Sequence, residues 1–256
     1  MKTLGRSFTI AFSMYSRIPM PHVEWDRQSM RYAFCFFPLI GIVNGALLWL
    51  WLYFCQIWNI GSVLAAAVAV VLPLAVTGGI HLDGFCDTVD ALASHQPTEK
   101  KLEILKDPHI GAFALIGCCC YLIMQFGLWA QYQFEPYTAL ILSLSFVLSR
   151  AMSGFAVVTF PCAKTSGLAA GFSNAAQKNC VRTVMIIYAL CVVGLMLYLN
   201  PFAGGMTILA AAAVYVWYWN MSNKEFGGIT GDLAGWFLQM CELVMLFSVV
   251  LFGGIL

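Results

Sequence analysis

The sequence of 256 residues has little charge, because only 10% of its residues are Asp, Glu, Lys or Arg, against about a quarter in soluble proteins. The 13 basic residues nearly balance the 12 acidic ones, which leaves a net charge of +1 and excludes a basic nucleic-acid-binding protein. Hydrophobic residues make up 61% of the chain and the mean hydropathy is +0.82, which excludes a disordered chain and an ordinary soluble domain. The composition predicts an all-α, polytopic integral membrane bundle.

Several motifs are also absent. The chain has no GxxxxGK[ST] motif, which excludes ATP hydrolysis by a P-loop. Its ten cysteines include no CxxC pair, and its four histidines show neither HxxxH nor HxH spacing. These absences argue against a disulfide framework and against a zinc site.

Seven apolar stretches are long enough to cross a bilayer, which takes about 20 residues. They cover residues 33–55, 62–80, 111–131, 137–160, 183–199, 203–221 and 234–254. Long polar segments alternate with short ones between them, and 12 of the 13 basic residues lie in the long segments. By the positive-inside rule the long segments are cytoplasmic. We expect one membrane domain over residues 1–256, multi-pass in the bacterial cytoplasmic membrane.

The N-terminal residues 3–18 are too short and too charged for a crossing. They are typical of an amphipathic helix that lies in the membrane interface. We expect Phe8, Phe12 and Tyr15 to anchor this helix in the lipid.

The acidic residues are concentrated in one stretch, where Asp83, Asp87 and Asp90 follow Gly78-Gly79. Their i, i+4, i+7 spacing places three carboxylates on one face of a helix that begins beside an apolar run, hence near the membrane surface. Stacked carboxylates need a compensating cation, and oxygen ligands suit Mg²⁺ or Mn²⁺. The alternative is a solvated acidic face.

A glycine-rich segment, residues 227–232, stands directly before the last apolar stretch. Its Gly228, Thr230 and Gly231 would let backbone N–H groups approach phosphate oxygens at a helix N-terminus. Glycines also precede membrane helices for purely conformational reasons, so this alternative stays open. Asp232 beside the glycines is a candidate second metal ligand.

The candidate phosphate-binding cations are Arg17, Lys106, Arg150 and Lys164. Arg17 and Lys164 have the alternative role of cytoplasmic anchors, and Lys106 that of a solvated helix residue. Arg150 lies inside an apolar stretch, where Arg costs about 2.5–3.5 kcal/mol, so it should face a cavity or an acid. Glu242 needs a partner for the same reason, and the two could pair with each other.

Histidines flank the acidic stretch, and His81 is the one expected to touch the site. Carboxylate-held divalent ions, a glycine loop and a few cations together favour phosphoryl transfer, which depends on positioning and electrostatics. No Ser-His-Asp arrangement competes with this interpretation.

In chain order these motifs resemble those of the cobalamin synthase family, the adenosylcobinamide-GDP ribazoletransferases. The resemblance covers nearly the whole chain. Its motifs are Ser16-Arg17-Ile18-Pro19-Met20-Pro21, Gly78-Gly79-Ile80-His81-Leu82-Asp83-Gly84 with Asp87 and Asp90, Leu102-Glu103-Ile104-Leu105-Lys106-Asp107 with Ile110-Gly111, Ser149-Arg150, Gly167-Leu168, and Gly227-Gly228-Ile229-Thr230-Gly231-Asp232. Departures are Ala91 in place of the usual Gly, Pro108-His109 in place of Ser-Arg, and Lys164 where Arg is common. Every aspartate is kept.

The resemblance implies a Mg²⁺-dependent transferase that joins adenosylcobinamide-GDP to α-ribazole, or to α-ribazole 5′-phosphate. The products are adenosylcobalamin, or its 5′-phosphate, and GMP, in a late step of cobalamin (vitamin B12) biosynthesis. The implied metal ligands are Asp83, Asp87, Asp90 and Asp232, with Glu103 or Asp107 as proton acceptor or additional ligand. The implied substrate-binding residues are Arg17, His81, Lys106, Arg150, Lys164, Gly228, Thr230 and Gly231.

Two other classes of membrane protein, CDP-alcohol phosphotransferases and transporters, have sequence patterns that differ from this one. A CDP-alcohol phosphotransferase has the pattern Asp-x2-Asp-Gly-x2-Ala-Arg, whereas here Asp83 is followed directly by Gly84 and no Ala-Arg follows. A transporter would carry its ionisable residues near the membrane midplane, whereas most acids here lie in the predicted cytoplasmic loops. The sequence leaves the oligomeric state open, a homo-oligomer included.

Overall fold

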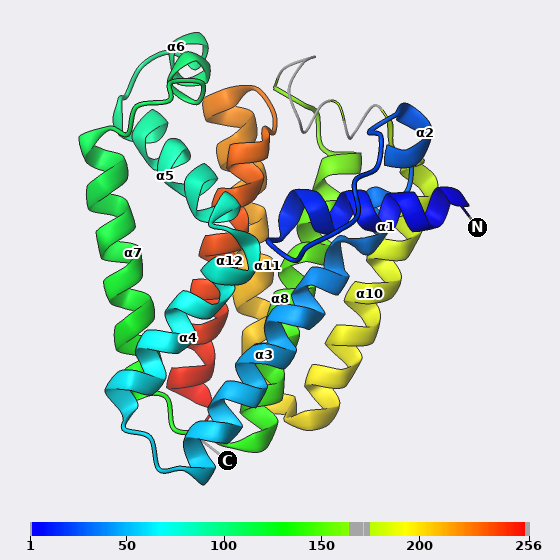
Figure 1. Cartoon of the computed structure of the whole chain (residues 1–256). Helices are drawn as coiled ribbons and strands as arrows, with labels where there is room; N and C mark the ends of the chain where they lie inside the picture. The colour runs from blue at the N-terminus through cyan, green and yellow to red at the C-terminus, as the bar shows by residue number, and fades with distance from the viewer. Residues whose placement is uncertain (1, 164–170, 172–174, 254–256) are drawn as a thin grey trace.

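The computed structural model describes residues 2–163, 171 and 175–253 of the chain (Figure 1). Among these residues the regular elements are helices, and a single β-bridge pairs Cys162 with Ile229. The helices are α1 (Lys2–Tyr15), α2 (Arg27–Met30), η1 (Ala33–Phe36), α3 (Phe37–Ile57), α4 (Ser62–Thr77), α5 (Ile80–Ala93), α6 (Thr98–Ile104), α7 (Ala112–Gln131), α8 (Pro136–Thr159), α10 (Lys178–Leu199), α11 (Pro201–Phe226) and α12 (Gly231–Phe252). The predicted all-α class is confirmed.

Six described helices are long and apolar enough to cross a membrane, and a seventh crossing results if α4 and α5 count as one broken span. The predicted apolar stretches correspond to α3, α4, α7, α8, α10, α11 and α12. Successive crossings run in opposite directions, and the short connections lie at one end of the bundle (Figure 1). Length and composition therefore support the predicted multi-pass membrane protein.

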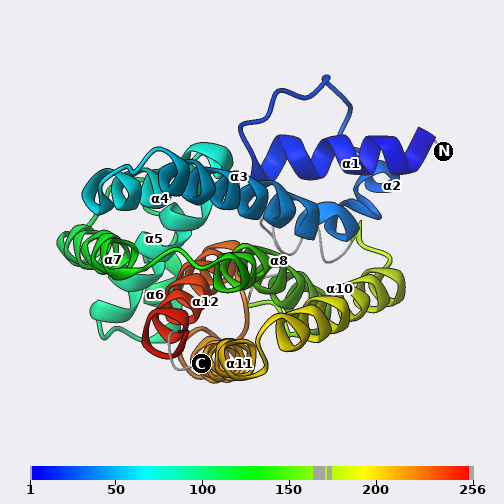
Figure 2. The ribbon, with the colours of Figure 1, turned by 90° about the horizontal axis from the view of Figure 1, so that it is seen from below.

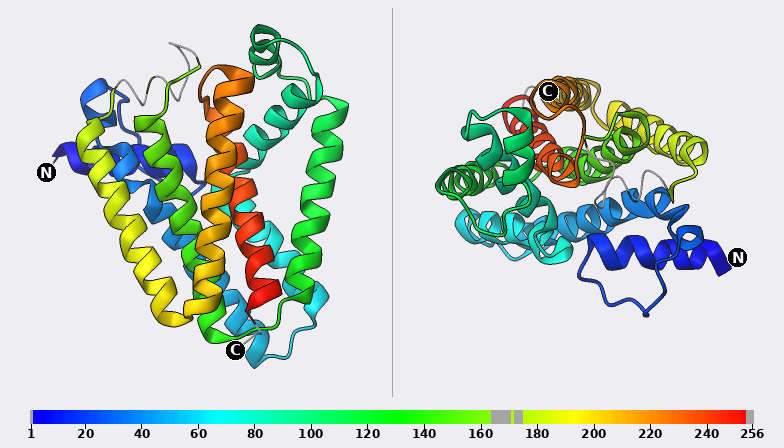
Figure 3. Two further views of the ribbon diagram at one scale, coloured as in Figure 1. Left: turned by 180° about the vertical axis from the view of Figure 1, so that it is seen from behind. Right: turned by 90° about the horizontal axis from the view of Figure 1, so that it is seen from above.

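Helix α8 lies in the middle of the bundle, with α3 on one side and α10 on another (Figure 2). Of its most apolar stretch, 83% is buried, against 22% for α10. Helix α12 packs against α5, α8 and α11, which Figure 3 shows from behind and from above. Helices α8 and α12 are therefore the most deeply buried of the described long apolar helices, and the site residues they carry can be shielded from lipid and water.

Helices α4 and α5 meet at an angle of 97°. Gly78 and Gly79 separate them with φ values of 68° and 78°, a left-handed conformation that favours glycine. As a result α5 begins inside the bundle, about halfway along it, and rises toward the end that carries α6 (Figure 1). That the acidic helix starts near the membrane surface stays a prediction, since the structure determines only the bend at Gly78 and Gly79.

Helix α1 confirms the predicted N-terminal helix and lies across the ends of the bundle helices (Figure 1). Its aromatic residues, however, face protein. The Phe8 ring lies 5.6 Å from that of Phe36, and the Tyr15 ring lies 4.6 Å from that of Phe37, while Phe12 is buried. The predicted lipid anchoring by these aromatic residues is wrong, since η1 and α3 offer an apolar surface that covers them.

Helices α5 and α12 cross in close contact at two glycines. A Cβ atom at Gly84 would lie 2.8 Å from both the Cα and the carbonyl oxygen of Asp232, and one at Gly235 would lie 2.9 Å from the carbonyl oxygen of His81. Small residues at such a crossing let two membrane helices approach closely. This contact holds the acidic face of α5 beside Asp232.

We expect Gly84→Ala to destabilise the protein by about 1–3 kcal/mol, because the added methyl group collides with backbone atoms. The matched control is Gly127→Ala on α7, where a Cβ meets no heavy atom within 4 Å. Thermal unfolding of both variants in one detergent measures the difference. An unchanged melting temperature for Gly84→Ala would contradict the close crossing.

Candidate active site

The three aspartates of α5 lie on one side of the helix, together with Asp232 at the start of α12. Asp87 lies within electrostatic reach of Asp83, Asp90 and Asp232, so four carboxylates from two helices share one region. In the described part of the chain, no lysine or arginine forms an ion pair with Asp83, Asp87 or Asp90. Within these described residues, the negative charge of the three α5 aspartates is therefore not balanced by a direct lysine or arginine partner.

A cavity of about 270 Å³ lies between α1, η1, α3, α5, α8 and α12. Asp83, Asp232 and Gly231 contribute to its polar side, together with His81 and Ser153. Its apolar side includes Met14, Tyr15, Phe34, Phe37, Val157 and Leu238. The cavity thus combines carboxylates with an aromatic wall, a combination that suits an amphipathic ligand.

Among the predicted metal ligands, Asp90 has a further contact. Its Oδ1 accepts a hydrogen bond of 3.4 Å from the backbone N–H of Ala114, in the first turn of α7, where the helix dipole favours negative charge. Across the described residues, no group of three or more His, Cys, Asp or Glu side chains is arranged to hold a metal ion. The carboxylates have the donor chemistry that Mg²⁺ prefers, but they do not form a closed cage.

Such an open arrangement still fits Mg²⁺. This ion dehydrates reluctantly and is usually held by one or two carboxylates together with water and substrate phosphates. Asp83 and Asp232 line the same cavity from two helices, and Asp87 lies within reach of both. These residues therefore fit a metal whose remaining ligands come from a bound diphosphate.

The glycine-rich segment is held by backbone hydrogen bonds. The N–H of Ile229 donates to the carbonyl of Pro161 over 2.8 Å, and the N–H of Gly228 donates to the carbonyl of Ser222 over 3.0 Å. The Thr230 hydroxyl accepts a 3.2 Å hydrogen bond from the N–H of Leu233 and so caps α12. Gly228 and Thr230 thus have structural partners, and Gly231 is the member of this set that lines the cavity.

Of the predicted phosphate-binding cations, Arg17 and Lys106 are placed by the structure and neither lines the cavity. Arg17 donates its backbone N–H to Val76 over 2.7 Å, and its exposed side chain lies against Gly78 at the bend between α4 and α5. Lys106 is exposed beyond the end of α6. Lys164 lies outside the described residues. The structure therefore places Arg17 beside the site and leaves Lys106 in solvent.

Arg150 is fully buried and does not line the cavity. Its Nη1 lies 2.7 Å from Oε1 of Glu242 and 2.9 Å from the carbonyl oxygen of Phe146. The Ser149 hydroxyl donates to the same Glu242 oxygen over 2.8 Å. Of the two alternatives left open by the sequence, the structure has the internal ion pair.

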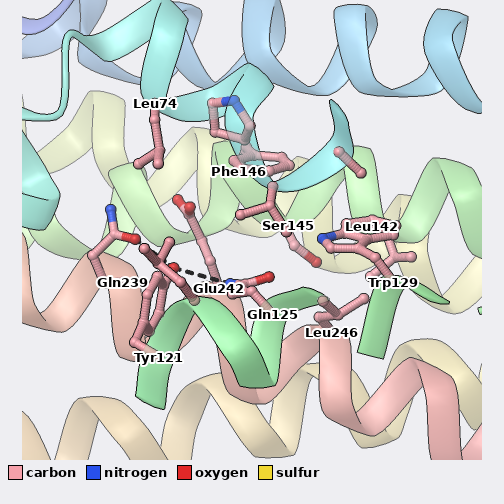
Figure 4. A pocket seen from close by; sticks show the side chains of 14 residues that line it. Leu74, Tyr121, Gln125, Trp129, Leu142, Ser145, Phe146, Gln239, Glu242 and Leu246 are labelled. Atoms are coloured by element: carbon pink, nitrogen blue, oxygen red, sulfur yellow. Dashed lines mark hydrogen bonds between the residues drawn. The ribbon is translucent and has the colours of Figure 1, made fainter. Parts of the chain in front are cut away.

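A second, smaller cavity of about 30 Å³ borders Glu242 (Figure 4). The side chains of Tyr121, Gln125 and Gln239 gather there. The Tyr121 hydroxyl donates to the side-chain oxygen Oε1 of Gln239 and accepts a hydrogen bond from Nε2 of Gln125. Hydrogen bonds of this kind satisfy polar groups inside a membrane bundle, where each unsatisfied group is costly. The Arg150–Glu242 pair borders this polar cluster through Glu242, and the Arg150 guanidinium lies 5.9 Å from the ring of Phe37, which lines the larger cavity.

The predicted proton acceptors Glu103 and Asp107 are exposed and lie outside the lining of both cavities. A hydrogen bond from Lys100 lowers the pKa of Glu103. The backbone N–H and ring of His109 lower the pKa of Asp107. Both changes make these carboxylates weaker bases. Neither its position nor its pKa therefore favours Glu103 or Asp107 as the proton acceptor.

Several site residues were missed from the sequence. Tyr15, Phe34, Phe37 and Ser153 line the cavity but follow no motif that the sequence reveals. Tyr15 alone could have been suspected from the sequence, because it stands two residues before the candidate cation Arg17. His81, which was expected at the site, lines the cavity and packs its ring 5.9 Å from that of Phe37.

Apolar crossings that enclose an aspartate-bordered cavity define a polytopic membrane protein with an internal site. The family model described as cobalamin-5-phosphate synthase matches residues 7–250, and the chain belongs to this family. A protein of Lachnoclostridium phytofermentans named adenosylcobinamide-GDP ribazoletransferase is 44% identical over all of this chain and 97% of its own length. Proteins of the same name from Clostridium botulinum (strain Alaska E43) and Clostridium perfringens (strain ATCC 13124) are 34% and 31% identical, over 98% and 100% of this chain and all of their own lengths.

No solved structure matches the chain. The family and its relatives make this protein an enzyme, a membrane transferase of cobalamin biosynthesis. This confirms the family to which the motifs pointed.

Proposed function

We propose that this protein transfers the adenosylcobinamide phosphoryl group of adenosylcobinamide-GDP to a hydroxyl of α-ribazole, or of its 5′-phosphate. The oxygen of that hydroxyl bonds to the phosphorus nearest the cobinamide. The bond from this phosphorus to the bridging oxygen breaks, and GMP leaves with the bonding electrons. The observation that carries the proposal is the family match over residues 7–250, joined to a cavity bordered by Asp83 and Asp232.

The residues of the chain have distinct parts in this reaction. Carboxylates from the set Asp83, Asp87, Asp90 and Asp232 would hold Mg²⁺, which would supply charge stabilisation for the phosphoryl group. The N-terminus of α12 at Gly231 adds a dipole that favours phosphate. Asp83 and Asp232 are the carboxylates that line the cavity, so whichever of the two does not bind the metal ion receives the proton of the attacking hydroxyl.

The same proposal puts this reaction at the cytoplasmic face of the cell membrane. Twelve of the 13 basic residues lie outside the predicted crossings, in the long segments, and α1 and α6 lie at the end of the bundle where α12 begins (Figure 1). The excess of basic residues supports a cytoplasmic location for this end. A site at the cytoplasmic face would also release GMP directly into the cytoplasm.

The test is an assay of purified protein with adenosylcobinamide-GDP and α-ribazole, in which cobalamin and GMP are both followed. Equal amounts of the two products are expected. Hydrolysis to GMP without cobalamin, or no reaction with either form of ribazole, would contradict the proposed activity.

We expect turnover to stop in EDTA and to return on addition of Mg²⁺. Because the carboxylates form no closed cage, we also expect Mg²⁺ alone to bind weakly and its affinity to rise at least about tenfold with the diphosphate substrate present. Calorimetric titration with Mg²⁺, with and without the corrinoid substrate, measures this coupling. Full turnover in EDTA would exclude the metal.

A further inference from the structure

The larger cavity has a size and a lining that select among the parts of the proposed substrates. Sites for drug-sized ligands enclose about 300–1,000 Å³, so a cavity of about 270 Å³ takes one small ring system rather than a corrin ring. Its aromatic wall is compact, since the Tyr15 ring lies 4.6 Å from that of Phe37 and 6.1 Å from that of Phe34. Aromatic walls of this kind favour a flat aromatic ligand.

Two polar groups in the wall have no hydrogen-bond partner within the described residues: Nε2 of the buried His81 ring and the hydroxyl of Ser153. Ser153 on α8 is 2% exposed and lines the cavity, yet within the described residues its hydroxyl forms no hydrogen bond. The other serines of the same helix behave differently, because Ser143, Ser145 and Ser149 each donate to a carbonyl three or four residues earlier. A hydroxyl that lines a cavity without a protein partner is available to donate to a ligand that accepts a hydrogen bond.

We propose that this cavity binds the benzimidazole base of the ribazole acceptor, and that the Ser153 hydroxyl donates a hydrogen bond to its unsubstituted ring nitrogen. This inference rests on the proposed function. The base of ribazole is a flat, largely apolar bicyclic ring whose one free nitrogen accepts a hydrogen bond and which carries no N–H donor. The Ser153 hydroxyl can donate to that nitrogen, while the aromatic rings of the cavity pack against the faces of the base.

Guanine is the other bicyclic base of the reaction, and the lining fits it less well. Guanine carries donors and acceptors around its edge, and each one left unpaired in a buried site lowers affinity. The residues that line this cavity include no Asn, Gln, Lys or Arg, and its two carboxylates are assigned to the diphosphate. With the benzimidazole against Tyr15 and Phe37, the ribose extends toward Asp83 and Asp232, where its hydroxyl is needed.

The test compares Ser153→Ala with the wild-type protein in the two-substrate assay. We expect the KM for α-ribazole to rise about 3- to 10-fold, the effect of one neutral hydrogen bond, with the KM for adenosylcobinamide-GDP unchanged. The matched control is Ser143→Ala on the same helix, whose hydroxyl bonds to Ala139, and it should leave both KM values unchanged.

An analogue in which the free ring nitrogen is replaced by C–H separates this contact from general packing. Wild-type protein should bind the analogue about 3- to 10-fold more weakly than α-ribazole, and Ser153→Ala should no longer distinguish the two. A second variant, Ser153→Leu, fills the cavity and should weaken α-ribazole further without affecting the corrinoid substrate.

Each other result has a defined meaning. A rise in the KM for the corrinoid substrate alone would assign the cavity to guanosine or corrinoid and overturn the inference. Unchanged α-ribazole kinetics in both Ser153 variants would overturn it as well. If the wild-type protein makes no cobalamin from either form of ribazole, the proposed function itself fails, and calorimetric binding of α-ribazole to wild type and Ser153→Ala still tests the cavity.

Discussion

Asp83→Asn is expected to reduce kcat by at least about 10²–10³-fold, because it removes one charge from the carboxylate group that holds the diphosphate. Asp83 is exposed to the cavity and the amide has nearly the same shape, so the fold should be kept. Release of GMP and formation of cobalamin by the purified variant measure the effect. We expect the same loss for Asp232→Asn, on the facing helix.

Controls for this prediction come from the exposed acids of the α6 region. Glu99→Gln changes the charge on α6 without touching the cavity and should leave kcat within about twofold. Glu103→Gln and Asp107→Asn test the roles predicted from the sequence, and we expect small effects because both carboxylates are exposed and paired with Lys100 and His109. Full activity of Asp83→Asn, or a large loss in Asp107→Asn, would mean that the reaction is centred elsewhere.

Glu242→Leu is expected to lower the free energy of unfolding by about 3–5 kcal/mol, because it leaves the Arg150 guanidinium buried without its partner. The double variant Arg150→Met/Glu242→Leu removes both charges and should recover most of this loss. Unfolding in mixed micelles measures the stability of each variant. The Arg150 guanidinium also lies 5.9 Å from the centre of the Phe37 ring, so the single variant should disturb the cavity wall.

An exposed ion pair serves as the comparison. Lys100 and Glu103 lie 2.8 Å apart with side chains that are 62% and 65% exposed, and such pairs contribute about 0–1 kcal/mol. Lys100→Met should therefore have a small effect on unfolding. Equal losses in Lys100→Met and Glu242→Leu would mean that burial of the Arg150 pair has no special energetic role.

Most of the long apolar helices could be predicted from the sequence, because an apolar run of about 20 residues is a local property. The stretch at residues 62–80 was the exception. Its length predicts a simple crossing, but the chain bends by 97° at Gly78 and Gly79, and α5 continues in another direction.

The candidate site was predictable where its residues follow a short-range pattern. Asp83, Asp87 and Asp90 recur with helical spacing, and a helix brings such residues together whatever the rest of the chain does. Residues of the Gly-rich segment were harder to interpret, because glycines serve close backbone packing as well as ligand binding. The hydrogen bond from the N–H of Ile229 to the carbonyl of Pro161 favours the packing role. No local sequence pattern predicts this hydrogen bond.

By itself, the sequence determined that this protein is a helical membrane bundle with an acidic helix, since hydropathy and helical spacing act within a few turns of one segment. Only the tertiary structure decided that Arg150 pairs with Glu242, 92 residues away, rather than with a phosphate. It also decided that Tyr15, Phe37 and Ser153 share one cavity with Asp83 and Asp232. The physical reason is that contacts between distant helices depend on how their surfaces pack, and the order of residues along one helix does not specify its neighbours.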